Sequence, residues 1–233
     1  MNGSAWNQED PLTYLPRKQV QEHPKGTVIY DPQRPSDGLY LVMLGRVKVS
    51  TVAEDGCQTI VRVVCSEGLF GESALVGRYA ESESATALDH VNLMAWSRSE
   101  IEQQVDREPR LGIALSQYLV RQCLGLQDRI ESMAVYKTPE RVMLALAQLS
   151  EALGAQQVDG SVRLPSLTHN TLAEYVGTSR EIVTFQMNRL RRMGLVNYSR
   201  KYIDVYTEPM QELLRQQGIS IPQGYSTSPG SVE

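Results

Sequence analysis

The sequence is poor in cysteine and contains no long apolar run. Three cysteines, Cys57, Cys65 and Cys123, occur among 233 residues. Because their number is odd and no two form a C-x-x-C pair, we predict neither a disulfide framework nor a metal site. No stretch of about 18 apolar residues is present, which argues against a membrane span. The polar first ten residues lack the order of a secretory signal, so we expect a cytoplasmic protein.

Catalytic residue patterns are also lacking. The three histidines, His23, His90 and His169, are scattered along the chain. We find no Ser-His-Asp order, no paired carboxylates with supporting residues and no Walker-type phosphate loop. We therefore expect that the protein is not an enzyme.

The net charge of -4 is unusual for a protein that binds nucleic acid, but the charge is unevenly distributed. Residues 1–136 hold 13 Lys and Arg against 18 Asp and Glu, whereas residues 163–201 hold seven against two. A basic segment on an acidic chain is typical of a nucleic-acid contact, although it is also compatible with an ordinary solvated face.

Residues 26–97 have the pattern of short β-strands. The apolar stretch 39–44 ends at Gly45, and alternating residues follow it. Glu54–Gly56 is a hairpin turn signal, and the returning strand places Cys57 and Cys65 on one face, as buried thiols rather than a redox pair. Short strands at about ten-residue spacing predict a barrel or a sandwich.

Residues 107–136 predict one amphipathic helix of about seven turns. Its apolar stripe has the spacing of a coiled-coil seam, which favours a homodimer; the alternative is that the stripe packs on the barrel. The predicted dimer interface consists of Leu111, Leu115, Leu119, Gln122, Leu126, Ile130 and Met133.

A break at 137–139 separates this helix from the next. Thr138 is a candidate N-cap and Pro139 a suitable early helical residue, and the helix is expected to end at Gly154. The segment after Gly218 is rich in Ser, Gly and Pro, which is typical of a disordered tail. The expected domains are a sensor barrel (1–106), a dimerisation helix (107–136), a DNA-binding domain (137–218) and the tail (219–233).

Residues 167–206 predict a winged helix-turn-helix. A short helix over 167–176 ends at Gly177, and Thr178 and Ser179 can cap a second helix over 180–193. A β-hairpin over 195–206 follows, with Arg200 and Lys201 at its tip.

The second helix is expected to have an inner and an outer face. Ile182, Val183, Met187 and Leu190 are predicted to pack inward. On the outer face, an arginine such as Arg180 can donate two hydrogen bonds to guanine, and Glu181 can accept one from cytosine. The alternative is an ordinary helical hairpin in which both are surface residues.

Two motifs resemble the catabolite-activator and fumarate-nitrate-reductase (CRP/FNR) family of bacterial regulators. Gly68–Leu75 resembles the family's phosphate-cassette segment, and Leu172–Val183 resembles its DNA-binding motif. The resemblance spans about residues 15–210. It implies an α+β fold: an N-terminal cyclic-nucleotide-binding-like β-roll (jelly-roll barrel), a long dimerisation helix and a C-terminal winged helix-turn-helix.

The resemblance also implies site residues. Arg180 and Glu181 read bases, and Phe185 stands where the best-known members have an arginine. The DNA-binding residues are expected to be Thr168, His169, Thr178, Ser179, Arg180, Glu181, Thr184, Phe185, Arg189, Arg200 and Lys201. The effector-binding residues are expected to be Gly71, Glu72, Ser73, Arg78, Glu83, Ser84 and Gln127.

The sensor departs from the cyclic-AMP pattern of the family at one position. Glu72 matches the acidic residue that binds the ribose, but Glu83 stands where an arginine should pair with the cyclic phosphate. A carboxylate there would repel a phosphate, unless Arg78 replaces the lost charge. Residues 1–56 hold no cysteine for an iron–sulfur cluster, and an isolated His23 or His90 is a weak candidate for haem.

The function predicted from these patterns is a sequence-specific transcription regulator that binds a palindromic operator as a homodimer, without a cyclic-AMP effector. Double-stranded DNA is the expected partner, and RNA polymerase is a further candidate. One alternative is a cyclic-AMP-dependent regulator. The other, from a different class, is a small-molecule sensor that acts through protein partners.

Overall fold

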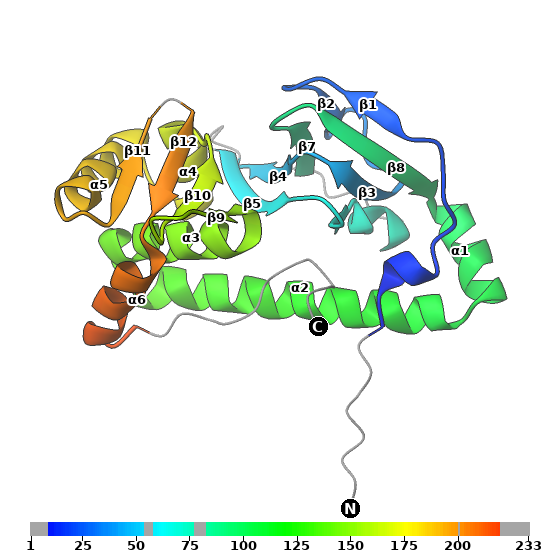
Figure 1. The fold of residues 1–233 in the computed structure, drawn as a ribbon. Helices are drawn as coiled ribbons and strands as arrows, with labels where there is room; N and C mark the ends of the chain where they lie inside the picture. The colour runs from blue at the N-terminus through cyan, green and yellow to red at the C-terminus, as the bar shows by residue number, and fades with distance from the viewer. Residues whose placement is uncertain (1–8, 54–57, 77–82, 200, 220–233) are drawn as a thin grey trace, which may run out of the picture. The chain divides into compact units, whose positions relative to one another are not determined.

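The computed structural model describes residues 9–53, 58–76, 83–199 and 201–219 (Figure 1). These residues fall into two compact units. The first holds residues up to 49 together with 64–127, and the second holds 50–63 together with the residues from 128 onward. The hairpin turn expected at Glu54–Gly56 lies outside the described residues, and so does Cys57.

Two four-stranded sheets form the N-terminal β-roll, with antiparallel pairs such as β3–β8 and β2–β7. Their strand orders are β1-β8-β3-β6 and β2-β7-β4-β5. The strands are β1 Gln21–His23, β2 Val28–Tyr30, β3 Gly38–Leu44, β4 Val47–Val52, β5 Gln58–Val64, β6 Leu69–Phe70, β7 Glu83–Ala87 and β8 Val91–Ser97. The predicted β-roll is confirmed.

The roll encloses an apolar core. Val42, Val47 and Leu93 are fully buried inside it, together with Phe70 at the end of β6. Gly71 follows with a φ of +87°, and a Cβ there would lie 2.6 Å from the carbonyl oxygen of Gly38. This position therefore requires glycine on both conformational and steric grounds. The short 3-10 helix η2, Glu72–Val76, begins directly after it.

The long helical region consists of two helices rather than one. α1 spans Arg98–Arg107 and begins with a capping box between Ser97 and Glu100. Helix α2 spans Arg110–Val135, so the helix expected from Arg107 begins three residues later, after Pro109. We did not anticipate α1, although the Ser-x-x-Glu spacing of its capping box is a sequence signature of a helix start.

The first turns of α2 pack against the β-roll. Leu111 and Leu115 are buried in the same cluster as Leu39 and Trp96. The Tyr118 hydroxyl donates a hydrogen bond of 2.6 Å to the carbonyl oxygen of Leu69. This corrects the expected dimer seam, because Leu111 and Leu115 are covered by their own chain and are not available to a second copy.

The C-terminal unit is built around helix α3, Thr138–Leu153 (Figure 1). Lys137, not Thr138, is the N-cap of α3 and forms no side-chain capping bond, so the cap expected at Thr138 is wrong. The other elements are β9 Ala155–Gln156, β10 Val162–Pro165, α4 His169–Val176, α5 Arg180–Arg192, β11 Val196–Tyr198, β12 Tyr202–Val205 and α6 Thr207–Gln216.

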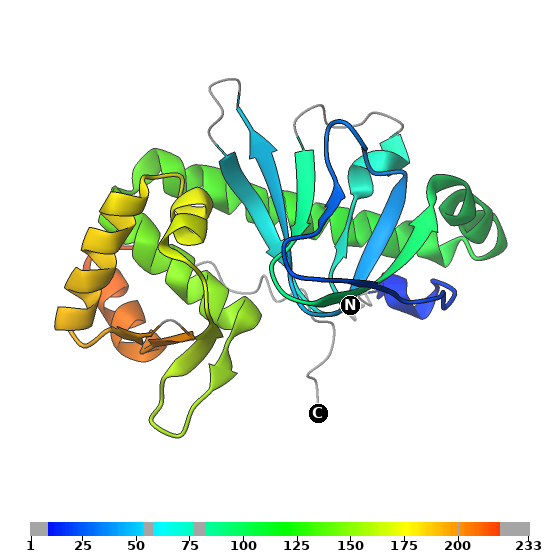
Figure 2. The same cartoon turned by 90° about the horizontal axis from the view of Figure 1, so that it is seen from above.

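A four-stranded sheet of order β11-β12-β10-β9 joins these helices. Figure 2 shows the β9–β10 hairpin extending away from the helices of this unit. The core contains Leu146 of α3, Met187 of α5 and Leu214 of α6, all fully buried. Ile219 is 5% exposed and belongs to this core, so the predicted tail begins one residue too early. Residues 220–233 lie outside the described part.

Candidate DNA-binding site

The turn between α4 and α5 depends on a glycine. Gly177 has φ 73° and ψ 51°, the left-handed conformation, and ends α4 as expected. The backbone N–H groups of Gly177 and Thr178 both donate to the carbonyl oxygen of Ala173, at 2.9 and 3.1 Å. Among the described residues, a Cβ at Gly177 would meet only Met133, at 3.5 Å, so glycine is required here by conformation rather than by space.

Helix α5 has a buried and an exposed face. Ser179 caps it by accepting a hydrogen bond of 3.3 Å from the Ile182 N–H. Val183, Met187 and Leu190 are buried as predicted. Ile182 is 42% exposed, so its predicted inward position is wrong. The inner face instead takes in Gln186, because the positions three and four residues after Val183 both lie on it.

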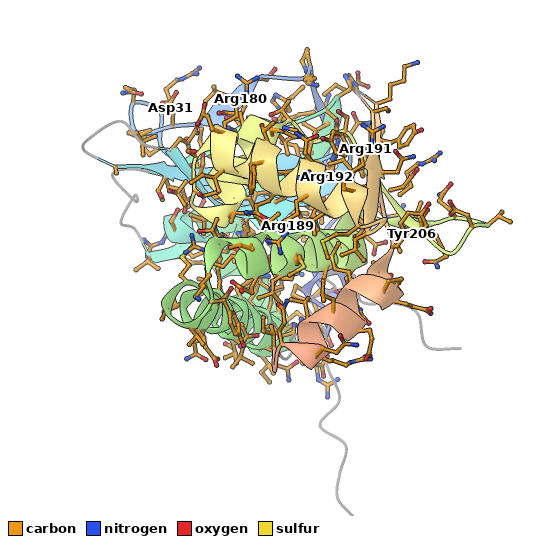
Figure 3. The ribbon with its side chains drawn as sticks, turned by 90° about the vertical axis from the view of Figure 1, so that its left-hand side faces the viewer. Asp31, Arg180, Arg189, Arg191, Arg192 and Tyr206 are labelled. Atoms are coloured by element: carbon orange, nitrogen blue, oxygen red, sulfur yellow. The ribbon has the colours of Figure 1, made fainter. Side chains whose placement is uncertain are left out.

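The exposed face of α5 carries the side chains expected to read bases. Arg180, Glu181 and Arg189 are exposed, and Phe185 is 60% exposed between them in sequence. Figure 3 shows α5 with Arg180 and Arg189 labelled along it. A hydrogen bond from its own backbone N–H, with a smaller one from Ser179, holds the pKa of Glu181 below its usual value. Glu181 is therefore an ionised hydrogen-bond acceptor near neutral pH.

Besides Ser179, three of the expected DNA-binding residues have structural roles in this fold. Thr168 caps α4, accepting a hydrogen bond of 3.0 Å from the Thr171 N–H. The Thr184 hydroxyl donates to the Arg180 carbonyl oxygen at 2.8 Å. His169 Nδ1 lies 2.9 Å from the same hydroxyl oxygen. Thr178 is half-buried in the turn.

One basic residue of the segment 163–201 is paired within the sheet β11-β12-β10-β9. Arg163 donates to both carboxylate oxygens of Asp204, at 2.6 and 2.9 Å, and its guanidinium lies 4.1 Å from the centroid of the Tyr202 ring. Its charge is thus compensated within the sheet. Lys201 is exposed beyond β11, and Arg200 lies outside the described residues.

Helix α2 exposes large apolar side chains along its length. Four belong to the predicted dimer interface, namely Leu119, Leu126, Ile130 and Met133, whereas Gln122 is half-buried. The full set of exposed apolar residues is Ile113, Leu119, Val120, Leu124, Leu126, Ile130, Met133 and Val135. Leu119, Leu126, Ile130 and Met133 follow one another at steps of three, four or seven residues and so share one side of the helix, and we call these four residues the α2 apolar face.

Arg129 lies on α2 within the second compact unit and has no carboxylate among its described contacts. It donates to the carbonyl oxygens of Val61 on β5 and, at 2.6 Å, of Tyr175 on α4. The guanidinium lies 4.9 Å from the centroid of the Tyr175 ring. Burial lowers the pKa of Arg129, but arginine remains charged. Two carbonyl dipoles and an aromatic face therefore stabilise this cation.

The chain matches two domain families and is similar to bacterial transcriptional regulators. Residues 20–108 match a cyclic nucleotide-binding domain, and residues 140–209 match a Crp-like helix-turn-helix domain. The transcriptional regulator SdrP of Thermus thermophilus is 32% identical over 166 residues, which are 70% of this chain and 76% of that protein. The chain belongs to the CRP/FNR family.

Other CRP/FNR proteins support the same assignment. The CRP-like cAMP-activated global transcriptional regulator of Mycobacterium tuberculosis is 25% identical over 189 residues, covering 80% of this chain and 84% of that protein. The crystal structure of TTHA1359, a CRP/FNR regulator of T. thermophilus, superposes with a TM-score of 0.69 and 29% identity, over 88% of this chain and all of that one. This CRP/FNR chain is a DNA-binding transcription regulator, in a family of regulators rather than enzymes.

In the sensor of this CRP/FNR protein, Glu83 at the start of β7 is half-buried and hydrogen-bonded. The Tyr30 hydroxyl donates to Glu83 Oε1 at 2.7 Å, and the Ser73 hydroxyl lies 3.4 Å from the same oxygen. Tyr30 also belongs to an aromatic cluster with Tyr40 and Phe70, with ring centroids 5.1 to 6.1 Å apart. No sequence motif marks Tyr30, which is 53 positions from Glu83.

The other predicted effector residues are only partly brought together. Gly71 and Glu72 adjoin Ser73 at the start of η2, and Ser84 follows Glu83 on β7. Gln127 is exposed on α2. Arg78, the candidate for the missing positive charge, lies outside the described residues.

The described residues also bear on membrane spans and metal sites. No helix among them is long and apolar enough to cross a membrane. No group of three or more His, Cys, Asp and Glu side chains among them is arranged to hold a metal ion. Burial raises the pKa of the Cys65 thiol to about 11, so this thiol is protonated and unreactive near neutral pH.

Proposed function

We propose that this regulator binds a palindromic operator as a homodimer. The α2 apolar face supports dimerisation, because large apolar residues exposed along one side of a helix are typical of a surface that a partner covers. In helix-turn-helix dimers, two recognition helices enter successive major grooves about 34 Å apart. The operator is then expected to have two-fold symmetry.

The exposed face of α5 carries this proposal. Arg180 donates to the edge of a guanine, and Glu181 accepts from a cytosine amino group. Phe185 is an apolar contact for a thymine methyl group. Arg189, Arg200 and Lys201 contact phosphates, which position the domain without reading sequence. The DNA-binding domain comprises residues 137–219, and the chain acts in the cytoplasm, where it contacts RNA polymerase.

Cyclic AMP is not required for DNA binding in this proposal. The supporting observation is the hydrogen bond from Tyr30 to Glu83, because it holds a carboxyl group at the position where the family's arginine pairs with the cyclic phosphate. A phosphate placed beside this carboxylate would be repelled, and binding would also have to disrupt the existing hydrogen bonds.

A cyclic-AMP-dependent regulator is the second candidate function. It is favoured by the match of residues 20–108 to a cyclic nucleotide-binding domain and by the M. tuberculosis relative, which is described as cAMP-activated.

Selection of duplexes from a random pool, with and without cyclic AMP, tests both proposals. We expect selection of the same palindrome in both cases, and an affinity for the selected duplex that cyclic AMP does not change. Selection of an asymmetric half-site would contradict the dimeric operator. A rise in operator affinity of tenfold or more on adding cyclic AMP would favour the second candidate.

A further inference from the structure

His169 connects three elements of the C-terminal unit. It is the first residue of α4, and its Nδ1 atom lies 2.9 Å from Thr184 Oγ1 on α5. Its ring packs edge-on against Tyr198 of β11, with centroids 5.5 Å apart. The half-buried imidazole also lines a groove, together with Ser166, Thr168, Tyr198 and Ser199. Its orientation is therefore fixed by contacts on two sides.

The hydrogen bonds of Thr184 determine which ring nitrogen of His169 carries the proton. A threonine hydroxyl has one hydrogen, and Thr184 donates it to the Arg180 carbonyl oxygen at 2.8 Å. The contact between Thr184 Oγ1 and His169 Nδ1 is then a hydrogen bond only if Nδ1 is the donor. The neutral imidazole consequently carries its proton on Nδ1 and a lone pair on Nε2.

The lone pair on Nε2 has a consequence for DNA. Among the residues that the structure describes, none forms a hydrogen bond with Nε2 of His169. The phosphate oxygens of DNA accept hydrogen bonds and cannot donate them. The Nε2 atom of a neutral His169 therefore has no proton to donate to a phosphate oxygen, and its lone pair would be repelled by that oxygen. The imidazolium form donates a hydrogen bond from Nε2 and adds a positive charge.

We propose that His169 binds a DNA phosphate only in its protonated form, so that each engaged DNA-binding domain takes up one proton at this residue. The proposal deepens the DNA-binding function and does not depend on the palindrome or on the effector. It also gives Thr184 a positioning role, since this hydroxyl fixes the His169 tautomer instead of reading a base.

The charged and titratable neighbours of His169 set the direction of the pH dependence. From α5 the facing charge is Arg180, and from β11 the facing titratable group is Tyr198, whose ring lies 5.5 Å from the Arg191 guanidinium. On α4 itself, Glu174 accepts a hydrogen bond from Asn170. Burial, and then the charge of Arg180, lower the pKa of His169 in the free protein.

A bound phosphate acts in the opposite direction, because a nearby negative charge favours the imidazolium. The pKa of His169 is therefore higher in the complex than in the free protein. Linkage then requires DNA affinity to rise as the pH falls toward the pKa of the free protein. It also requires this gain to be lost as the pH rises through the pKa of the complex.

The test is the dissociation constant of the full-length protein for a fluorescent duplex, between about pH 5.5 and 8 at constant ionic strength. The wild type is expected to bind more tightly at acidic pH, by up to about tenfold per pH unit for each engaged domain. His90→Asn, which changes a histidine of the β-roll, should keep this dependence.

Two substitutions separate the roles of the ring nitrogens. His169→Gln places a neutral donor near the position of Nε2. The DNA affinity of this variant should therefore not change with pH, and should stay near the affinity of the wild type at acidic pH. His169→Asn keeps a donor near the position of Nδ1 only. The DNA affinity of this variant should also not change with pH, but it should stay near the affinity of the wild type at alkaline pH. Circular dichroism of both variants checks that the domain is folded.

Two results would overturn the proposal: a wild-type affinity that does not change with pH, or a pH dependence that persists in both His169 variants. Because phosphates occur in every duplex, the series is run on selected and on random DNA. A protein that selects no operator would contradict the operator proposal, while the pH dependence on random DNA would still decide this one.

Discussion

Charged side chains of helix α5 in the helix-turn-helix are exposed, whereas some of those in the sensor have partners within the β-roll. On α5, Arg180, Glu181 and Arg189 are exposed along a helix whose other face is buried in the core. In the β-roll, Glu83 accepts a hydrogen bond from Tyr30, and the buried Arg46 forms a bidentate pair with Asp89 at 2.5 and 2.8 Å. Exposed charges on a rigid element are available to an external partner, whereas charges satisfied internally must first lose a native contact.

The largest effect that would break this comparison is expected at Arg180. Arg180→Ala should lower the affinity for the selected operator by about 1–3 kcal/mol for each recognition helix, the value of one good base contact. Binding to random DNA should change little. Titration of both duplexes measures the two affinities, with Arg215→Ala on α6 as a charge-matched control. An equal loss on both duplexes would contradict a base-reading role.

The next largest effects are changes in the free energy of unfolding when a glycine of each region is replaced. Gly177→Ala should lower the free energy of unfolding by about 1–2 kcal/mol, because its left-handed backbone disfavours a side chain. Gly112→Ala, inside α2, should instead raise it by about 0.5–1 kcal/mol, since the added Cβ would meet Val105 at an ordinary contact distance of 3.5 Å. Urea unfolding measures both changes, and the same sign for both would refute this explanation.

A smaller effect is expected inside the sensor. Tyr30→Phe removes the hydrogen bond to Glu83 and should lower the free energy of unfolding by about 1 kcal/mol. Operator affinity should stay at the wild-type value, because the proposed function does not use this pocket as a ligand switch. Thermal unfolding and operator titration test the two statements. A large change in operator affinity would show that the sensor does control the DNA-binding domain.

The smallest effect is expected at the wing. Lys201→Ala should weaken binding to selected and random DNA alike, and should reduce the slope of log affinity against log salt by about one per wing. Titrations at several salt concentrations measure this slope, with Lys25→Ala in the β-roll as the control. If Lys201→Ala relaxed the sequence preference without changing the slope, Lys201 would be a base contact.

The local parts of this fold could be predicted from sequence because their signals are local. Gly177 and Ser179 mark the end of one helix and the start of the next, and both have the expected roles. The capping box of α1 is equally local, so that helix was predictable although we did not predict it. Ile182 was misplaced because a helix with three buried positions per two turns does not specify its boundary residues.

The rest depends on contacts between distant residues. Leu111 and Leu115 have the spacing of a dimer seam, and the sequence cannot tell whether the β-roll or a second copy covers them. Glu83 can be singled out from the sequence as a departure from the family pattern, but its partner Tyr30 is defined only by the pairing of β2 with β7. The paired state of Arg163 likewise depends on the register of β10 against β12.

Arg129 has a consequence for how this protein can change over evolutionary time. It binds main-chain carbonyl oxygens at Val61 and Tyr175, and every amino acid supplies such an oxygen. Substitutions at position 61 can therefore accumulate without loss of that hydrogen bond. A search for pairs of positions that mutate together would miss this contact between α2 and β5, even in a deep collection of sequences.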